Sequence, residues 1–201
     1  MNVVLVGARG VGKTTVARQL GSLTKRPVLS TDLLISYDHG GLPIPRLLEE
    51  SGGDWRLFRE WEYAVVEKVS ALDGLIIDAG GGVVVDLDDE GREVYSERKM
   101  AALKARGQVV WIHGDLARAA VDARQDANRP ALSPTQSELE VMVRRLPFYR
   151  RAADVILEPA AGLTALHAAE WIVEHLELSR HGGHPQQPQQ PHPARKKTRR
   201  R

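Results

Sequence analysis

The sequence predicts an α/β fold, a three-layer sandwich in which helices cover both faces of a central parallel sheet. Short apolar runs alternate with longer segments whose apolar residues recur at helical spacing. This alternation is typical of parallel strands joined by right-handed helical crossovers. The chain has 201 residues, of which 42% are hydrophobic, so it can form one compact domain with a sizeable core.

Three strands and two helices are predicted in the first half of the chain. The strands are short runs rich in Val, Leu and Ile, as expected for strands buried on both faces, at residues 2–6, 27–29 and 75–77. One helix is expected over residues 14–23, and a longer one runs from Asp54, a suitable cap, to about Leu72. The longer helix has a core-facing stripe formed by Trp55, Phe58, Trp61, Val65 and Val69.

The second half continues the same alternation. Strands are predicted at residues 109–112 and 155–157, with helices at 96–106, 116–124 and 163–178. Thr135 and Glu138 have the spacing of a capping box. We expect a helix to begin there and to end near Pro147, because proline disrupts helix interiors. Residues 86–91 are acidic and read as a surface loop.

The composition changes at residue 181, which divides the chain into a predicted domain, residues 1–180, and a tail. Residues 181–201 hold six of the 28 Lys and Arg residues and none of the 26 acids, so residues 1–180 carry a net charge of −4. The tail is rich in Pro and Gln and lacks the apolar side chains that offset the entropy of ordering, which predicts disorder. Its basic end, residues 195–201, is either a solvated segment or a contact for nucleic acid or an acidic partner.

The sequence also bounds the environment of the protein. No cysteine is present, which excludes a disulfide scaffold, a thiolate zinc site and a cysteine nucleophile. The N-terminus has no basic region or cleavage site of a secretory leader, and no apolar stretch reaches membrane length. We expect a cytoplasmic monomer with no membrane partner.

The most specific chemical signal is the glycine-rich segment of residues 7–14. It reads Gly-Ala-Arg-Gly-Val-Gly-Lys-Thr and matches G-x-x-x-x-G-K-[ST] directly between the first strand and the first helix. Such a loop points backbone N–H groups and a helix N-terminus at an anion. Lys13 would reach the β- and γ-phosphates and Thr14 would coordinate Mg²⁺. The predicted nucleotide-binding residues are Gly10, Val11, Gly12, Lys13, Thr14 and Thr15.

This loop occurs in GTPases, motor ATPases and small-molecule kinases, so the phosphate acceptor depends on other residues. Five clusters follow it: Ser30-Thr31-Asp32, Phe58-Arg59-Glu60-Trp61-Glu62, Gly80-Gly81-Gly82, Arg129-Pro130-Ala131-Leu132 and Arg145-Leu146-Pro147-Phe148-Tyr149. In order and spacing, over residues 1 to about 178, they resemble the shikimate kinase family, with its patterns F-R-x-x-E, R-P-L-L and R-x-P-L-Y. The resemblance implies a fold of the P-loop kinase type, ATP and Mg²⁺, and phosphorylation of shikimate to shikimate 3-phosphate in aromatic amino-acid biosynthesis.

The residue types agree with an acceptor that is a small carboxylated polyol. Arg59 and Arg145 offer guanidinium groups that match a carboxylate bidentately. By resemblance they would clamp the acceptor carboxylate, Asp32 would hold the reacting hydroxyl and take its proton, and Gly80, Gly81 and Gly82 would line the ring. The alternatives are a surface ion pair for Arg59, a solvated helix-end cation for Arg145 and a helix cap for Asp32.

A lid is predicted at residues 125–135, a polar segment with prolines between two helices. Arg129 on this lid would close over ATP, neutralise charge on the transferring phosphoryl group and exclude water. Its alternative is a loop arginine without a role. Lys13, Asp32 and Arg129 are therefore the predicted catalytic residues, and Arg129 also counts among those that bind ATP.

Four positions depart from the family pattern, and two of them, Ala131 and Phe148, each replace a leucine and read as packing changes. The family has Asp-x-Asp after the second strand, and Ser30 stands at the first of these positions. The third strand ends at Asp78, as in a Walker B strand, so we expect Thr14 and Asp78 to serve Mg²⁺, with Ser30 adding a hydroxyl or a bound water. Asp122 replaces the arginine that the family places against adenine, and Arg118 or Arg124 could substitute.

Two other functions are compatible with these motifs. One is a different small-molecule kinase, of the gluconate or nucleoside-monophosphate type. The other is a non-catalytic ATP-binding module that its basic tail tethers to nucleic acid. The arginine pair favours an acceptor with a carboxylate.

Overall fold

The structure is a computed structural model that describes residues 1–125, 130, 132–133, 135–158 and 163–179. Its centre is a parallel sheet of five strands in the order β2-β3-β1-β6-β7. These strands are β1 (Asn2–Val6), β2 (Val28–Ser30), β3 (Ile76–Asp78), β6 (Gly107–Ile112) and β7 (Val155–Leu157). The predicted fold class is confirmed. The predicted tail and most of the predicted lid, Arg129 included, lie outside the described residues.

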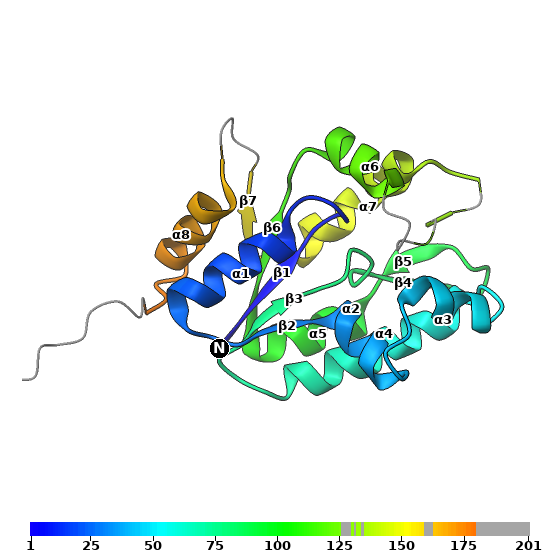
Figure 1. The fold of residues 1–201 in the computed structure, drawn as a ribbon, viewed down its shortest axis with the longest axis horizontal. Coiled ribbons are helices and arrows are strands. Elements are labelled where there is room, and N and C mark those ends of the chain that lie inside the picture. Colours follow the sequence, from blue (N-terminus) through cyan, green and yellow to red (C-terminus); the bar gives the residue numbers. More distant parts are fainter. Residues whose placement is uncertain (126–129, 131, 134, 159–162, 180–201) are drawn as a thin grey trace, which may run out of the picture.

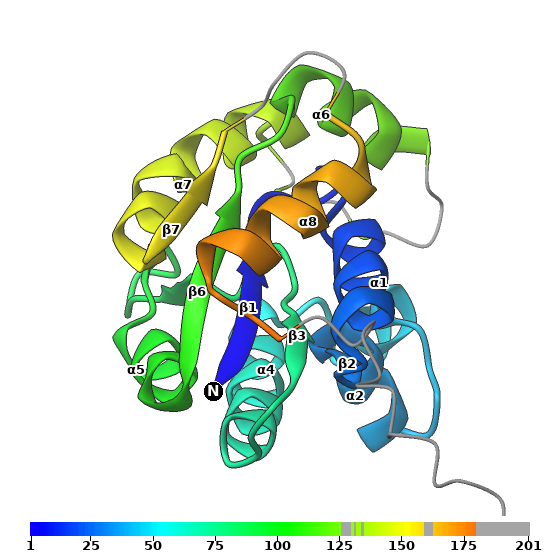
Figure 2. The same cartoon turned by 90° about the vertical axis from the view of Figure 1, so that its left-hand side faces the viewer.

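Helices cover both faces of the sheet (Figures 1 and 2). One face carries α1 (Lys13–Thr24) and α8 (Ala165–His175), and the other carries α4 (Trp55–Ser70), α5 (Glu97–Arg106), α6 (Leu116–Gln125) and α7 (Glu138–Ala152). Both faces need a cover because the side chains of each strand alternate between them, as strand β1 shows. Val3 and Leu5 pack with the first pair of helices, and Val4 and Val6 with the second group.

Three features of the fold escaped the sequence prediction. Helix α2 (Thr31–Asp38) follows β2 without a loop and takes Ser30 as its N-cap, and α3 (Ile44–Glu50) comes shortly after it. The predicted surface loop at 86–91 is wrong in part, because β4 (Val85–Leu87) and β5 (Glu93–Tyr95) form an antiparallel hairpin there. The residues between these strands form its turn.

Helix α7 differs from its prediction at both ends. The capping box consists of Ser137 and Glu140, whose Oγ and Oε2 atoms accept hydrogen bonds from each other's backbone N–H at 3.3 and 2.7 Å. The helix also continues past Pro147 to Ala152. Proline removes one helical hydrogen bond, but Tyr149 and Ala152 are buried in the core, and this packing holds the last turn in place.

The sheet brings its functional segments to one edge. In the strand register, Asp78 at the end of β3 lies beside Leu5 of β1 on one side and Ser30 of β2 on the other. The carboxyl ends of parallel strands are where α/β proteins bind ligands. None of the helices in the described ranges combines the length and apolar composition that crossing a membrane requires.

Candidate active site

A cavity of about 390 Å³ lies at the carboxyl ends of β1, β2 and β3. The glycine-rich loop lines one part of it. The rest is lined by residues from the ends of β2 and β3, from α2, α3 and α4, from the segment after β3, and by Pro130 and Leu132. The predicted site residues that share this cavity are Gly10, Gly12, Lys13, Thr14, Thr15, Asp32, Arg59, Asp78, Gly80, Gly81 and Gly82. The fold therefore brings most of the predicted site together.

The glycine-rich loop has the backbone of an anion cradle. Gly10 and Gly12 adopt φ values of 82° and 92°, in the left-handed region that glycine enters at little cost. Gly12 is also the N-cap of α1, so the positive end of that helix dipole faces the cavity. Lys13 lies across the loop, where its Nζ donates to the Ala8 carbonyl at 3.0 Å. The arrangement fits a polyphosphate.

A pair of oxygen ligands stands next to this cradle. The Thr14 hydroxyl donates to Oδ2 of Asp78 at 2.6 Å, and both residues line the cavity. Ser30, the register partner of Asp78, lines it too. A hydroxyl and a carboxylate are the hard oxygen donors that Mg²⁺ takes, so the set of donors fits this cation.

Asp32 occupies the wall of the cavity at the first turn of α2. Burial, together with the nearby Glu62, raises the pKa of Asp32 to about 6, although Lys13 acts in the opposite direction. A side chain at Gly80 would collide with the Asp32 carboxylate, so glycine there leaves this carboxylate in place. Asp32 is thus a carboxylate with raised proton affinity beside the phosphate cradle, as a general base requires.

Arg59 closes the same cavity from α4. Its side chain is buried, and its Nη1 donates to Oε2 of Glu62 at 2.9 Å. The Arg59–Glu62 pair therefore exists, but in the interior and not on the surface as the alternative interpretation had it. Within the described part of the chain, Arg59 Nε has no hydrogen-bond partner. A side chain at Gly82 would collide with the guanidinium, and a buried donor without a partner indicates a place for an acceptor group.

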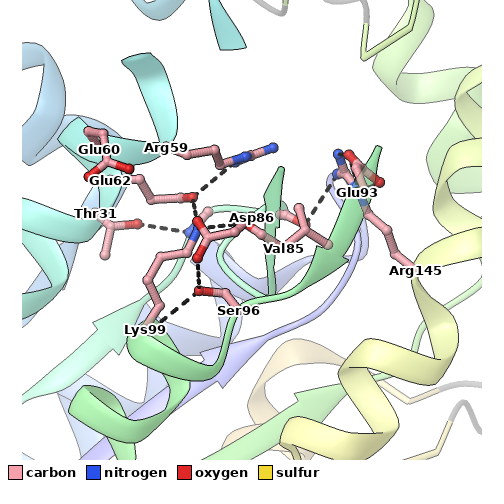
Figure 3. A network of polar contacts seen from close by, with 12 residues as sticks. Thr31, Arg59, Glu60, Glu62, Val85, Asp86, Glu93, Ser96, Lys99 and Arg145 are labelled. Carbon is pink, nitrogen blue, oxygen red and sulfur yellow. Dashed lines mark hydrogen bonds and ion pairs between the residues drawn. The ribbon is translucent and has the colours of Figure 1, made fainter. Parts of the chain in front are cut away.

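Arg145 lies in a second cavity of about 460 Å³, which also includes Arg59. Figure 3 shows the two arginines reaching toward the same region from α4 and α7. Glu93 of β5 accepts from Arg145 Nε at 3.0 Å and also from its Nη2. Burial alone would raise the pKa of Glu93, but the hydrogen bonds and charge of Arg145 lower it to about 2. Arg145 is thus held beside the phosphate-loop cavity and does not line it.

The comparisons with known proteins agree with this geometry. A family model for shikimate kinase matches residues 9–177. The chain is 39% identical over 174 residues to a shikimate kinase of Leptospira biflexa, an overlap of 87% of this chain and 94% of that relative. The chain belongs to the shikimate kinase family. A solved structure of the shikimate kinase of Acinetobacter baumannii in complex with shikimate covers 88% of this chain and 92% of its own, with a TM-score of 0.74 and 29% identity.

The shikimate kinase family and the P-loop kinase fold that the sequence predicted are therefore confirmed. A further relative, the shikimate kinase of Pseudomonas syringae pv. syringae, is 32% identical over 160 residues and covers 78% of this chain and 86% of its own length. The solved shikimate kinase of Aquifex aeolicus has a TM-score of 0.69 at 24% identity, covers 88% of this chain and 96% of its own, and adds support for the fold.

Sequence reasoning gave no role to Tyr149, although it stands in the family pattern R-x-P-L-Y. Its hydroxyl donates to the carbonyl of Gly81, which Arg145 Nη1 also contacts at 3.5 Å. On the other side, the backbone N–H of Gly80 donates to the Thr31 hydroxyl at 2.9 Å. Helices α7 and α2 therefore hold the neighbouring residues Gly80 and Gly81 from two sides. The family pattern was the signal in the sequence that could have identified Tyr149.

A third cavity, of about 670 Å³, adjoins the glycine-rich loop on the side of α6. Gly10, Val11, Gly12 and Thr15 line it. Arg118, one of the two candidates for the contact with adenine, lines it as well. The side chain of the other candidate, Arg124, and the whole of Arg129 are outside the described part of the chain.

Proposed function

We propose that the protein transfers the γ-phosphoryl group of ATP to a hydroxyl of shikimate and releases ADP and shikimate 3-phosphate. The observation that carries this proposal is one cavity in which Lys13 and the glycine-rich loop lie with Asp32 and Arg59. Membership of the shikimate kinase family supports it, as does the structural likeness to a relative solved with shikimate.

The nucleotide is proposed to lie along the glycine-rich loop. Its phosphates would take the loop N–H groups and the Lys13 ammonium, and its base would enter the cavity lined by Arg118, Gly12 and Thr15. The third cavity meets the first at Gly10 and Gly12, so a nucleotide can extend from one into the other. Arg118 is therefore our choice for the residue that packs against adenine.

Thr14 and Asp78 are proposed to hold Mg²⁺, with Ser30 beside them. Their oxygens are already in contact at 2.6 Å, and Asp78 stands in the strand next to Ser30, where the family has an acid. When bound, Mg²⁺ neutralises charge on the nucleotide phosphates. The carboxylate missing from β2 is thus supplied from β3.

The acceptor is proposed to lie between Asp32 and the two arginines. Its carboxylate would satisfy Arg59 and face Arg145, its ring would pack against residues 80–82, and its reacting hydroxyl would donate to Asp32. Because the pKa of Asp32 is about 6, its carboxylate is largely ionised at neutral pH and can take the hydroxyl proton as the phosphoryl group transfers in line. Most of the acceleration comes from positioning and charge. Arg129 is proposed to add charge at the phosphoryl group.

The test is ADP release at saturating Mg-ATP with shikimate and with a panel of other hydroxy acids, sugars, gluconate and nucleoside monophosphates. Lys13→Met serves as the control for background ATP hydrolysis. We expect shikimate to give the highest kcat/KM by at least a hundredfold. Turnover of another acceptor at a higher kcat/KM, or no ADP release with shikimate above the Lys13→Met background, would contradict the proposed function.

A further inference from the structure

A fully buried lysine stands behind the acceptor end of the cavity. Lys99 of α5 is 0% exposed, and its ammonium donates to Oε2 of Glu62 at 2.7 Å and to the carbonyl of Val85 at 2.6 Å. Oδ1 of Asp86 lies 3.4 Å from the same nitrogen. Figure 3 shows this ammonium enclosed by its partners. A buried charge is costly unless it is paired, so these partners hold Lys99 in one geometry.

Glu62 is shared between two cations. Its Oε2 accepts both from Lys99 Nζ at 2.7 Å and from Arg59 Nη1 at 2.9 Å. Lys99 thus competes with Arg59 for the Glu62 carboxylate, so Glu62 neutralises less of the Arg59 charge than it would in an isolated pair. At the short distances of a partly dry cavity, that charge attracts an anion strongly. Arg59 therefore presents an incompletely neutralised guanidinium to the cavity that it lines.

The remaining contacts of Lys99 show which partner matters for the site. Asp86 already accepts from Arg98 Nε at 2.9 Å and from the Ser96 hydroxyl at 2.7 Å, and Arg98 also pairs with Glu60. Asp86 therefore has cationic and neutral donors apart from Lys99. Burial alone would raise the pKa of Glu62, but Lys99 and Arg59 outweigh it and hold this pKa below its ordinary value. Glu62 thus stays ionised and fixes the Arg59 guanidinium.

We infer that Lys99 is a positioning residue of the acceptor site, which acts through Glu62 to orient Arg59 and to leave its positive charge available to an acceptor carboxylate. Lys99 is absent from the described residues that line the cavities around Arg59, so it touches no substrate. The inference rests on the proposed function, in which Arg59 binds the carboxylate of shikimate.

The test compares Lys99→Met with Lys104→Met, a matched substitution on the same helix. Lys104 pairs with Asp154 at 2.8 Å, away from the cavities around Arg59. We expect Lys99→Met to raise the KM for shikimate about tenfold, which is the effect of about 1.4 kcal/mol. The kcat at saturating shikimate and the KM for ATP should stay within about twofold of wild type. Lys104→Met should leave all three constants within the same range.

A double-mutant cycle with Glu62→Gln separates positioning from a general loss of structure. Because Lys99 acts through Glu62, adding Lys99→Met to Glu62→Gln should raise the KM for shikimate no further. If Lys99→Met does not fold, the double variant Lys99→Met/Asp86→Asn, which removes one charge of each sign, takes its place. It is then compared with Lys104→Met and used in the cycle with Glu62→Gln. An unchanged KM for shikimate, or an equal rise in the presence and absence of Glu62, would overturn the inference.

Arg59→Met distinguishes failure of this inference from failure of the proposed acceptor site. If Arg59→Met raises the KM for shikimate while the Lys99 variants do not, only the inference about Lys99 is wrong. If Arg59→Met also leaves the KM for shikimate unchanged, the carboxylate site of the proposed function is wrong, and the role of Lys99 falls with it.

Discussion

The two ends of the main cavity are built in different ways. The phosphate end comes from one continuous segment, residues 7–15, and relies on backbone geometry and a helix N-terminus. The acceptor end collects side chains from distant segments, among them Asp32 and Arg59, and an ion pair with Glu62 holds Arg59 in place. The phosphate end therefore tolerates changes in its surroundings, whereas charged residues outside the cavity can change how the acceptor binds.

The largest expected effect is at the phosphate end. Lys13→Met should lower kcat by at least about a hundredfold, because the lysine stabilises charge that develops in the transition state. The free energy of unfolding should change little in comparison, since the methionine keeps most of the apolar stem. Kinetics with saturating shikimate and thermal unfolding of the same preparation would test this. A kcat within threefold of wild type would contradict the assigned role.

The second expected effect distinguishes the two arginines of the acceptor end, Arg59 and Arg145. Arg59→Met should weaken shikimate binding by about 2–3 kcal/mol, because it removes a buried charge from the carboxylate site. Arg145→Met should weaken binding less, since Glu93 already neutralises much of its charge. Calorimetric titration of both variants with shikimate measures the difference. A larger loss of shikimate affinity in Arg145→Met than in Arg59→Met, or no loss in Arg59→Met, would contradict the assignment of Arg59 as the main contact of the carboxylate.

The raised pKa of Asp32 makes a prediction about stability. The unfolded chain loses the Asp32 proton near pH 3.8 and the folded protein near pH 6, so between these values rising pH favours unfolding. Asp32→Asn should therefore be more stable than wild type at pH 7.5, by roughly 3 kcal/mol in the ligand-free protein. The gain should be much smaller at pH 4, where the folded protein holds the Asp32 proton and part of the unfolded population does as well. Urea unfolding at the two pH values tests this, and a gain independent of pH would refute it.

A smaller effect concerns the metal. Asp78→Asn should raise the Mg²⁺ concentration that gives half-maximal turnover about tenfold, since it removes the carboxylate beside Thr14. Ser30→Ala is the matched control from the neighbouring strand and should have a weaker effect. Turnover titrated with Mg²⁺ at fixed ATP gives both values. If Asp78→Asn leaves the Mg²⁺ dependence unchanged, β3 does not replace the acid that β2 lacks.

The difference between a continuous segment and side chains from distant segments also explains how much could be predicted from the sequence. The glycine-rich loop and the strands of the central sheet are local patterns, so their places were predicted closely. The contacts Lys99–Glu62 and Arg145–Glu93 join residues 37 and 52 positions apart, and no local pattern encodes them. They depend on where α5 and the β4–β5 hairpin pack. Pro147 failed as a helix end for a similar reason, because the tertiary packing of Tyr149 and Ala152 outweighed the local signal.

The most direct test of the proposed acceptor site is a crystal structure of the protein with shikimate and ADP bound. We expect the shikimate carboxylate within hydrogen-bond distance of the Arg59 guanidinium and a ring hydroxyl beside the Asp32 carboxylate, facing the glycine-rich loop. A shikimate molecule bound with its carboxylate away from Arg59, or with no hydroxyl near Asp32, would contradict it.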